Sequence, residues 1–89
     1  MVESIHEKFE RELGEALITS FPAIQLSEPK WIEEHCELWY NRTQVWVDPL
    51  TDHSIMVTLM NEDYSWSVVM ERNYIALIYL MIGFDNHPG

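Results

Sequence analysis

Apolar residues at the start of the chain recur at the spacing of a helix. The positions that carry this pattern are Ile5, Phe9, Leu13 and Leu17. Residues four apart lie on one face of a helix, so these side chains form one apolar stripe. Ser4 and Glu7 have the spacing of a capping box, in which each residue satisfies a free backbone N–H of the other. The pattern predicts a helix over residues 5–18.

A second helix is predicted after a connection that is bracketed by two prolines. Pro22 and Pro29 prevent a continuous helix through the segment that they enclose, so residues 21–28 are predicted to be extended. Ser27 is a suitable N-cap and Pro29 suits a first helical turn, which places the second helix over residues 29–38. Its apolar positions are Trp31, Ile32, Cys36 and Leu38.

The periodicity changes to that of strands after residue 40. Residues 44–47, 54–60 and 64–70 are rich in β-branched and aromatic side chains, and turn-forming residues separate them. These segments predict antiparallel strands that are linked by hairpins. In the segment 54–60, alternate residues face opposite sides of the sheet. Both sides carry apolar residues, so both sides of this strand are expected to need cover.

Residues 74–82 form an unbroken apolar run, which fits either a central strand or a short buried helix. A strand is favoured because Tyr and Ile are frequent in the run and the connection that precedes it is short. The chain is therefore predicted to be one α+β domain, residues 1–89, with two N-terminal helices packed on an antiparallel sheet of about four to five strands. Residues 1–40 would form the helical part, 41–84 the sheet and 85–89 a loose tail.

The composition adds a strong negative charge to this fold. The 89 residues include 15 Asp and Glu against five Lys and Arg, which gives a formal net charge of −10, while 47% hydrophobic residues are enough for one packed core. The phosphate backbone of a nucleic acid would repel such a surface, so no direct binding to nucleic acid is expected. A basic protein that itself binds phosphates is the complementary partner. The alternative is that the domain is acidic only as many small cytosolic domains are.

No pattern of residues predicts catalysis or a cofactor. Cys36 is the only cysteine, and its neighbour His35 has no further histidine at the spacing of metal ligands, so neither a disulfide nor a metal site is expected. The chain has no Gly-rich phosphate loop and no nucleophile elbow. It also lacks the pattern of a signal peptide and a run long enough to span a bilayer. These features predict a cytoplasmic protein that is not an enzyme and binds no membrane.

Three carboxylates around the predicted second helix mark a candidate binding surface. They belong to Glu28, Glu33 and Glu34. These residues surround Trp31 and Ile32, and Met56 offers an adaptable apolar contact on a neighbouring strand. Carboxylates around an apolar socket suit a protein partner. The same residues equally fit ordinary packing of a helix on a sheet, with the carboxylates solvated.

Residues throughout the chain resemble those of a known family. The matching positions are Glu10-Arg11-Glu12-Leu13-Gly14, Leu17, Pro29, Ile32-Glu33-Glu34, Asp48, Thr51-Asp52, Met56, Tyr64, Trp66 and Val69. Over nearly the whole chain, with short gaps, the sequence resembles the phage inhibitors of uracil-DNA glycosylase. Those inhibitors are small acidic DNA mimics with two N-terminal helices followed by an antiparallel sheet. None of the matching positions is as specific as a metal-ligand motif.

The resemblance implies a protein that blocks the DNA-binding groove of uracil-DNA glycosylase. Such enzymes flip a base out of the duplex and push an apolar side chain into the stack. The carboxylates that would take the place of phosphates are those of Glu28, Glu33 and Glu34. The hydrophobic pocket that would receive the inserted side chain comprises Trp31, Ile32, Met56 and Val69. No cofactor is implied.

The sequence departs from the family where an edge strand enters the groove of the enzyme. The family has a glutamate and a serine there, whereas residues 21–23 read Phe-Pro-Ala and carry no acid. Phe21, Ala23 and Ile24 are therefore predicted to contact the partner in a different way. His35 and Cys36 also replace apolar residues of the family, so the pocket is expected to differ in shape.

These departures leave two alternatives to a glycosylase inhibitor. One is a DNA mimic that blocks another nucleic-acid-binding protein, inside the host cell if the chain is encoded by a phage. The other is a structural subunit without enzymatic activity that assembles with copies of itself through residues 54–60 and 74–82.

Overall fold

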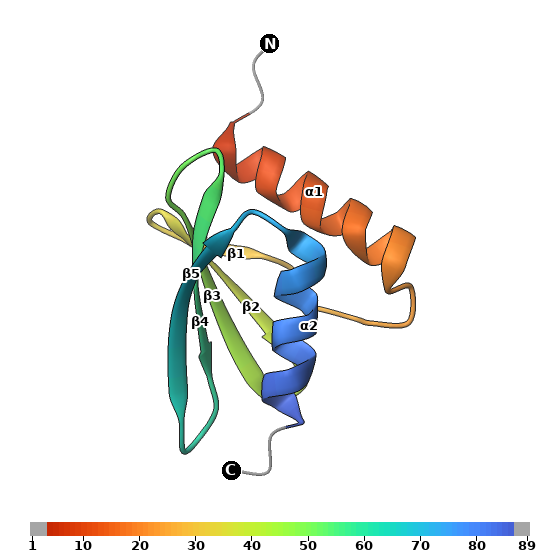
Figure 1. The fold of residues 1–89 in the computed structure, drawn as a ribbon, viewed down its shortest axis with the longest axis vertical. Coiled ribbons are helices and arrows are strands. Elements are labelled where there is room, and N and C mark those ends of the chain that lie inside the picture. The colour runs from red at the N-terminus through yellow and green to blue at the C-terminus, as the bar shows by residue number, and fades with distance from the viewer. Residues whose placement is uncertain (1–3, 87–89) are drawn as a thin grey trace.

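The computed structural model describes residues 4–86, which form one antiparallel sheet with a helix at each end of the chain (Figure 1). The elements in chain order are α1 (Ile5–Ser20), β1 (Lys30–Ile32), β2 (His35–Tyr40), β3 (Thr43–Pro49), β4 (Ser54–Met60), β5 (Ser65–Glu71) and α2 (Tyr74–Asp85). The α+β class and the antiparallel sheet of the sequence prediction are confirmed. No helix of the described chain is long and apolar enough to cross a membrane.

The sheet is a meander in which each strand pairs with the next one along the chain. Its order is β1-β2-β3-β4-β5, with every pair antiparallel. Both helices lie on the same side of it, with α2 along the sheet and α1 beside the start of α2 (Figure 1). Because side chains alternate between the two faces of a strand, half of the sheet residues face the helices and half face away. We call the side without helices the open face.

The core lies between the sheet and the helices. Its buried apolar residues are Phe9, Leu13, Cys36, Leu38, Val45, Val47, Ile55, Val57, Leu59, Tyr74, Leu77, Ile78 and Met81. The register explains why the strand residues meet, because Cys36 pairs with Val47 and Val47 pairs with Val57 on the same face. Cys36 is thus a core residue, as its sequence position predicts.

The first helix forms as its sequence predicts. The side-chain oxygen of Ser4 accepts a hydrogen bond from the backbone N–H of Glu7 at 3.1 Å, and the Glu7 carboxylate accepts one from the backbone N–H of Ser4. Phe9 and Leu13 are the buried residues of its apolar stripe. The helix continues to Ser20, two residues beyond the predicted end. The extended connection predicted over residues 21–28 contains no helix or strand.

The predicted second helix over residues 29–38 is wrong, because this segment forms the hairpin of β1 and β2. Glu33 and Glu34 make its turn, and Glu33 has a φ of 57°, in the left-handed region. Trp31 faces the helices and Ile32 faces away from them, as in a strand. Ser27 caps no helix, since its hydroxyl accepts a hydrogen bond from the backbone N–H of Trp39 at 2.8 Å. The period-two alternation of Cys36, Leu38 and Tyr40 outweighs the local helix-start signals.

The strand favoured over residues 74–82 is also wrong, because residues 74–85 form helix α2. Asn73 caps it, and its side chain accepts a hydrogen bond from the backbone N–H of Ala76 at 3.1 Å. The residues that α2 buries recur with helical spacing: Tyr74, Leu77, Ile78 and Met81. The expectation of two N-terminal helices is therefore corrected to one helix at each end. Of the predicted tail, Asp85 ends α2, and residues 87–89 lie outside the described residues.

The three predicted strands after residue 40 are confirmed: β4 has the predicted bounds, and the ends of β3 and β5 are shifted by one or two residues. In β4, Ile55, Val57 and Leu59 are fully buried. Met56 and Met60 lie on the open face and are half-buried. The sequence predicts both sides of β4 to be packed against other elements. Among residues 4–86, only the side that faces the helices is packed in this way.

Replacing Glu33 with glycine tests the hairpin that the sequence reading missed. A residue with a side chain costs about 1–2 kcal/mol in left-handed backbone. Glycine removes this cost, but part of the gain is lost because glycine gives the unfolded chain more conformational freedom. We expect Glu33→Gly to raise the free energy of unfolding by about 0.5–1 kcal/mol in urea titrations with an unchanged m-value. Glu34→Gly is the control, because Glu34 is not in the left-handed region. A loss of about 1 kcal/mol with Glu33→Gly would instead indicate a helix.

Candidate functional site

A row of five residues crosses all five strands on the open face. Ile32 pairs with His35, Asp48 pairs with Met56, and Met56 pairs with Val69. His35 Nδ1 lies 3.8 Å from Asp48 Oδ1, which joins the β2 and β3 parts of the row. We call these five residues the transverse row. It contains Ile32, Met56 and Val69, three of the four residues predicted to form the hydrophobic pocket. Only Met56 and Val69 are direct neighbours, because His35 and Asp48 separate Ile32 from Met56.

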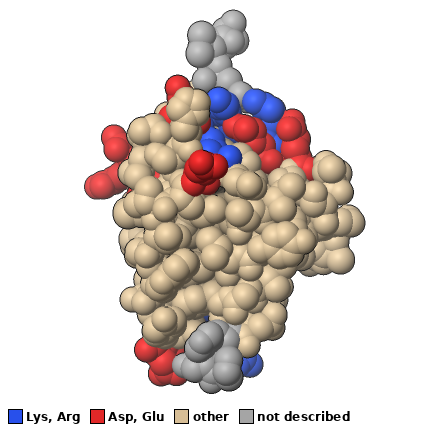
Figure 2. Space-filling view, viewed as in Figure 1, with Lys and Arg blue, Asp and Glu red and all other residues tan. Residues whose placement is uncertain are grey.

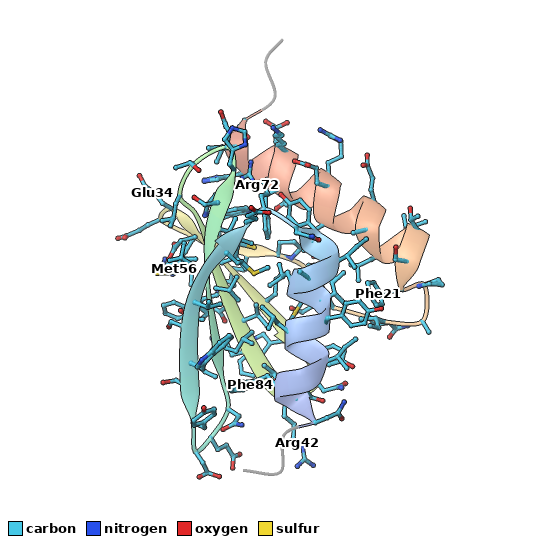
Figure 3. The ribbon with its side chains drawn as sticks, viewed as in Figure 1. Phe21, Glu34, Arg42, Met56, Arg72 and Phe84 are labelled. Atoms are coloured by element: carbon cyan, nitrogen blue, oxygen red, sulfur yellow. The ribbon has the colours of Figure 1, made fainter. Side chains whose placement is uncertain are left out.

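The apolar members of the transverse row are accessible. Val69 is 59% exposed and Ile32 is 37% exposed, while Met56 between them is half-buried. In Figure 3, Met56 projects from the side of the sheet away from α2. These three residues line neither of the hollows at the two ends of the sheet. We call these three residues the apolar strip, which the polar pair His35 and Asp48 divides between Ile32 and Met56.

Two aromatic rings stack in the middle of the open face. The rings of His35 and Trp46 are nearly parallel, with centroids 4.5 Å apart. His35 Nε2 and Trp46 Nε1 are both covered by neighbouring atoms and have no hydrogen-bond partner among residues 4–86. A buried polar group without a partner costs about 1–3 kcal/mol. The centre of the open face therefore holds polar atoms whose hydrogen-bonding capacity the fold does not use.

Carboxylates lie beside the transverse row, and one of them, Asp48, lies within it. Those on the open face or in the turn beside it belong to Glu33, Glu34, Glu37, Asp48 and Glu71. We call this group the acidic rim. Glu33 and Glu34 are exposed in the β1–β2 turn, and Figure 3 shows Glu34 at the same side of the molecule as Met56. Lys30 pairs with Glu37 and supplies one cation on this face, so the balance remains negative. Glu28 is exposed in the connection that leads into β1.

Trp31 lies on the opposite side of β1 from Ile32. Its ring stacks on His6 with centroids 3.8 Å apart, and its Nε1 donates a hydrogen bond to Glu10 Oε1 at 2.7 Å. It also meets the edge of Phe9, a core residue of α1. Trp31 thus ties β1 to α1, and the structure does not bring it together with the other predicted pocket residues.

The predicted contacts in the connection after α1 lie apart from the acidic rim. The Phe21 ring packs edge-on against Tyr79 of α2, with centroids 5.1 Å apart. Ala23 is exposed and Ile24 is half-buried. Figure 3 shows Phe21 on one side of α2 and Glu34 on the other side of the molecule. A single flat partner surface that contacts Glu34 therefore does not reach Phe21.

The two hollows are polar and lie at opposite ends of the sheet. The larger one, of about 820 Å³, is bordered by the turns after β2 and β4. It contains Asp85, whose carboxylate accepts hydrogen bonds from Thr43 Oγ1 at 2.9 Å and Asn41 Nδ2 at 3.0 Å, and so fastens the end of α2 to the sheet. The smaller one is bordered by Lys8 and Arg72 together with three carboxylates. Because charges of both signs line the smaller hollow, its net charge is small.

The described residues include no candidate metal site, and their one cysteine is buried. No group of three or more His, Cys, Asp or Glu side chains between residues 4 and 86 is placed to hold a metal ion. Burial raises the pKa of the Cys36 thiol from 9.0 to about 12, and the nearby Glu10 carboxylate adds to this effect. The thiol is therefore protonated at neutral pH and is a poor nucleophile.

Comparison with known proteins adds no relative: no family model, no curated protein and no solved structure matches this chain. The function is therefore argued from the geometry of the chain itself. Sequence reasoning missed His35, Glu37, Trp46 and Asp48 as parts of the open face. Their positions follow from the period-two alternation of β2 and β3, which the sequence contains but which the predicted helix over residues 29–38 obscured.

We expect the Cys36 thiol of the folded protein to be unreactive towards an aromatic disulfide reagent at pH 8, and to react fully in urea. Burial also raises the pKa of Tyr74 from 10.0 to about 12. Both groups lose their protons at lower pH in the unfolded chain, so the free energy of unfolding should fall as the pH rises from about 9 to about 12. Tyr74→Phe should reduce this slope. Rapid modification of the native thiol at pH 8 would contradict the buried placement of Cys36.

Proposed function

We propose that the protein is a non-enzymatic DNA mimic, which places its open face on the basic surface of a nucleic-acid-binding protein. The observation that carries this proposal is the transverse row with the acidic rim beside it, on the side of the sheet that packs no helix. A basic groove made for phosphates and bases requires negative charge around flat or apolar groups. The open face supplies both.

The charge of the protein supports fast association with such a partner. A net charge of −10 on 89 residues attracts a basic surface over the whole approach, which raises the association rate. Within the complex, the carboxylates of the acidic rim take the positions of phosphates. Lys or Arg side chains of the partner then pair with carboxylates in place of DNA, and DNA is excluded by occupancy.

The apolar strip supplies the part of the binding energy that does not depend on charge. Burying an exposed Val or Ile side chain contributes up to about 1.5–3 kcal/mol. Val69 and Ile32 are the exposed members of the strip, and the flexible thioether of Met56 beside Val69 adapts to the shape of the partner surface.

Uracil-DNA glycosylase is the target that the sequence resemblance favours. Among the matching residues, Ile32, Met56 and Val69 share the transverse row, and Glu33 and Glu34 form the turn at its β1 end. The order of elements differs from that of the family, because residues 29–38 form a hairpin in place of a second helix. The target is therefore proposed on the matching surface residues and not on the order of helices and strands.

The inhibition assay uses a uracil-containing oligonucleotide, purified bacterial uracil-DNA glycosylase and increasing amounts of the protein. We expect stoichiometric loss of uracil excision, with weaker inhibition as the salt concentration rises because ion pairs at the interface are screened. Unimpaired excision at a large excess of the protein would remove this target. A pull-down with other DNA-binding proteins would then decide whether the DNA-mimic proposal survives.

Charge reversal at the β1–β2 turn tests which face binds. We expect the double variant Glu33→Lys/Glu34→Lys to abolish inhibition while the free energy of unfolding stays within about 0.5 kcal/mol of the original value, as for exposed sites generally. The matched control is Glu62→Lys/Asp63→Lys, which makes the same change of charge in the β4–β5 turn at the far end of the sheet. Equal loss with both pairs would indicate a general charge effect, and no loss with the first pair would place the interface elsewhere.

A further inference from the structure

Helix α2 is apolar on the side that faces solvent as well as on the side that faces the sheet. Residues on its outward side are spaced by four and all three are exposed: Ile75, Tyr79 and Gly83. Tyr79 is 62% exposed and Ile75 is 45% exposed. We call these three residues the outer stripe. A helix that is apolar all round is normally covered all round, so the outer stripe is a surface that lacks its cover in a single chain.

The surroundings of the outer stripe carry little charge beyond the first turn of α2, where Arg11, Glu12 and Arg72 act electrostatically on Tyr74. Asp85 is the only charged residue of α2, and its carboxylate is held by Thr43 and Asn41. Figure 2 shows that the face on which α2 lies carries no Lys, Arg, Asp or Glu across its middle. Charged groups gather at the two ends of this view. The uncharged middle contrasts with the open face, where carboxylates lie beside the apolar strip.

This distribution of charge favours a second copy of the chain over a basic partner as the occupant. Two molecules with a charge of −10 repel each other at any surface that brings their carboxylates together. A contact centred on the outer stripe holds the carboxylates at its periphery, where physiological salt screens charges separated by more than about 8 Å. A strongly basic partner finds no carboxylate in the middle of this face. It is attracted to the acidic rim instead.

The spacing within the outer stripe is self-complementary. If two copies of α2 cross antiparallel about a two-fold axis at Tyr79, Ile75 of one copy lies opposite Gly83 of the other. A side chain built on Gly83 would meet no atom within 4 Å, so the space beside it is open to a partner. The contact is then isologous, with the same residues on both sides. Phe21, which packs on Tyr79, extends the apolar surface beyond α2.

We infer that the protein forms a symmetric homodimer through the outer stripe of α2, leaving the open face of each copy available. The dimer presents two acidic faces at once. The inferred dimer goes beyond the proposed function and is independent of it, since the outer stripe and the open face share no residue.

Sedimentation velocity over a range of protein concentrations tests the dimer. We expect a mass of twice 10.6 kDa at high concentration and dissociation on dilution. Added NaCl should strengthen the dimer, because screening reduces repulsion between two acidic chains, whereas it should weaken the complex with a basic partner. A mass of one chain at every concentration, in low and high salt, would overturn the inference.

Two variants locate the contact. Tyr79→Arg places two like charges at the centre of the interface, and we expect it to raise the dissociation constant at least tenfold. Gly83→Leu fills the space opposite Ile75 and should weaken the dimer without destabilising the monomer, because leucine favours a helix more than glycine does. The control is Val69→Arg, an equally exposed apolar residue on the open face, which should leave the dimer intact. A dimer that resists both α2 variants, or that only Val69→Arg dissociates, would overturn the inference.

Discussion

The packing of α2 on one side of the meander is the interaction on which the rest of the structure depends. Leu77, Ile78 and Met81 bury their side chains completely or nearly so against the strands, and every fully buried strand residue lies on that same side. Each such aliphatic side chain contributes about 1.5–3 kcal/mol. Since α1 and α2 both lie on one face of the five-stranded sheet, the opposite face has no helix over it among residues 4–86.

This asymmetry gives the molecule two surfaces with different chemistry. The open face combines an apolar strip with carboxylates, so association there depends on charge and weakens with salt. The outer side of α2 exposes Ile75 and Tyr79, so the dimer inferred there should have the opposite salt dependence. The two are separated by the thickness of the domain, which allows each to be altered by substitution without direct contact with the other. Helix α1 contributes to neither surface directly, and its bonds to Trp31 hold β1 in the sheet.

The sequence predicts those elements whose local signals agree with their tertiary context. The capping box of Ser4 and Glu7 marks the start of α1, and alternation with turn-forming residues marks β3, β4 and β5. At residues 29–38 the local signals conflict, because Ser27 and Pro29 favour a helix start while the alternation of later residues favours a strand. Tertiary pairing with β3 decides for the hairpin. Residues 74–82 form part of a helix of 12 residues that Asn73 caps. The β propensity of the Tyr and Ile residues in this run does not predict that helix.

The candidate site is less predictable than the fold because it depends on register. Ile32, Met56 and Val69 are distant in sequence, and only the pairing across β1 to β5 places them in one row. A shift of one residue in any pair would move a side chain to the other face. The same effect separates Trp31 from Ile32, although the two are adjacent in the chain. Carboxylates are visible in the sequence, but which of them share a face is not.

The most direct test of the central claim is a nuclear magnetic resonance titration of side-chain methyl groups with uracil-DNA glycosylase. The account predicts large shifts or broadening for the methyl groups of Ile32, Met56 and Val69, with Ile75 on the outer side of α2 unchanged as an internal reference. Perturbation confined to Ile75, or saturating binding that leaves all three open-face methyl groups unchanged, would contradict the assignment of the open face as the binding surface.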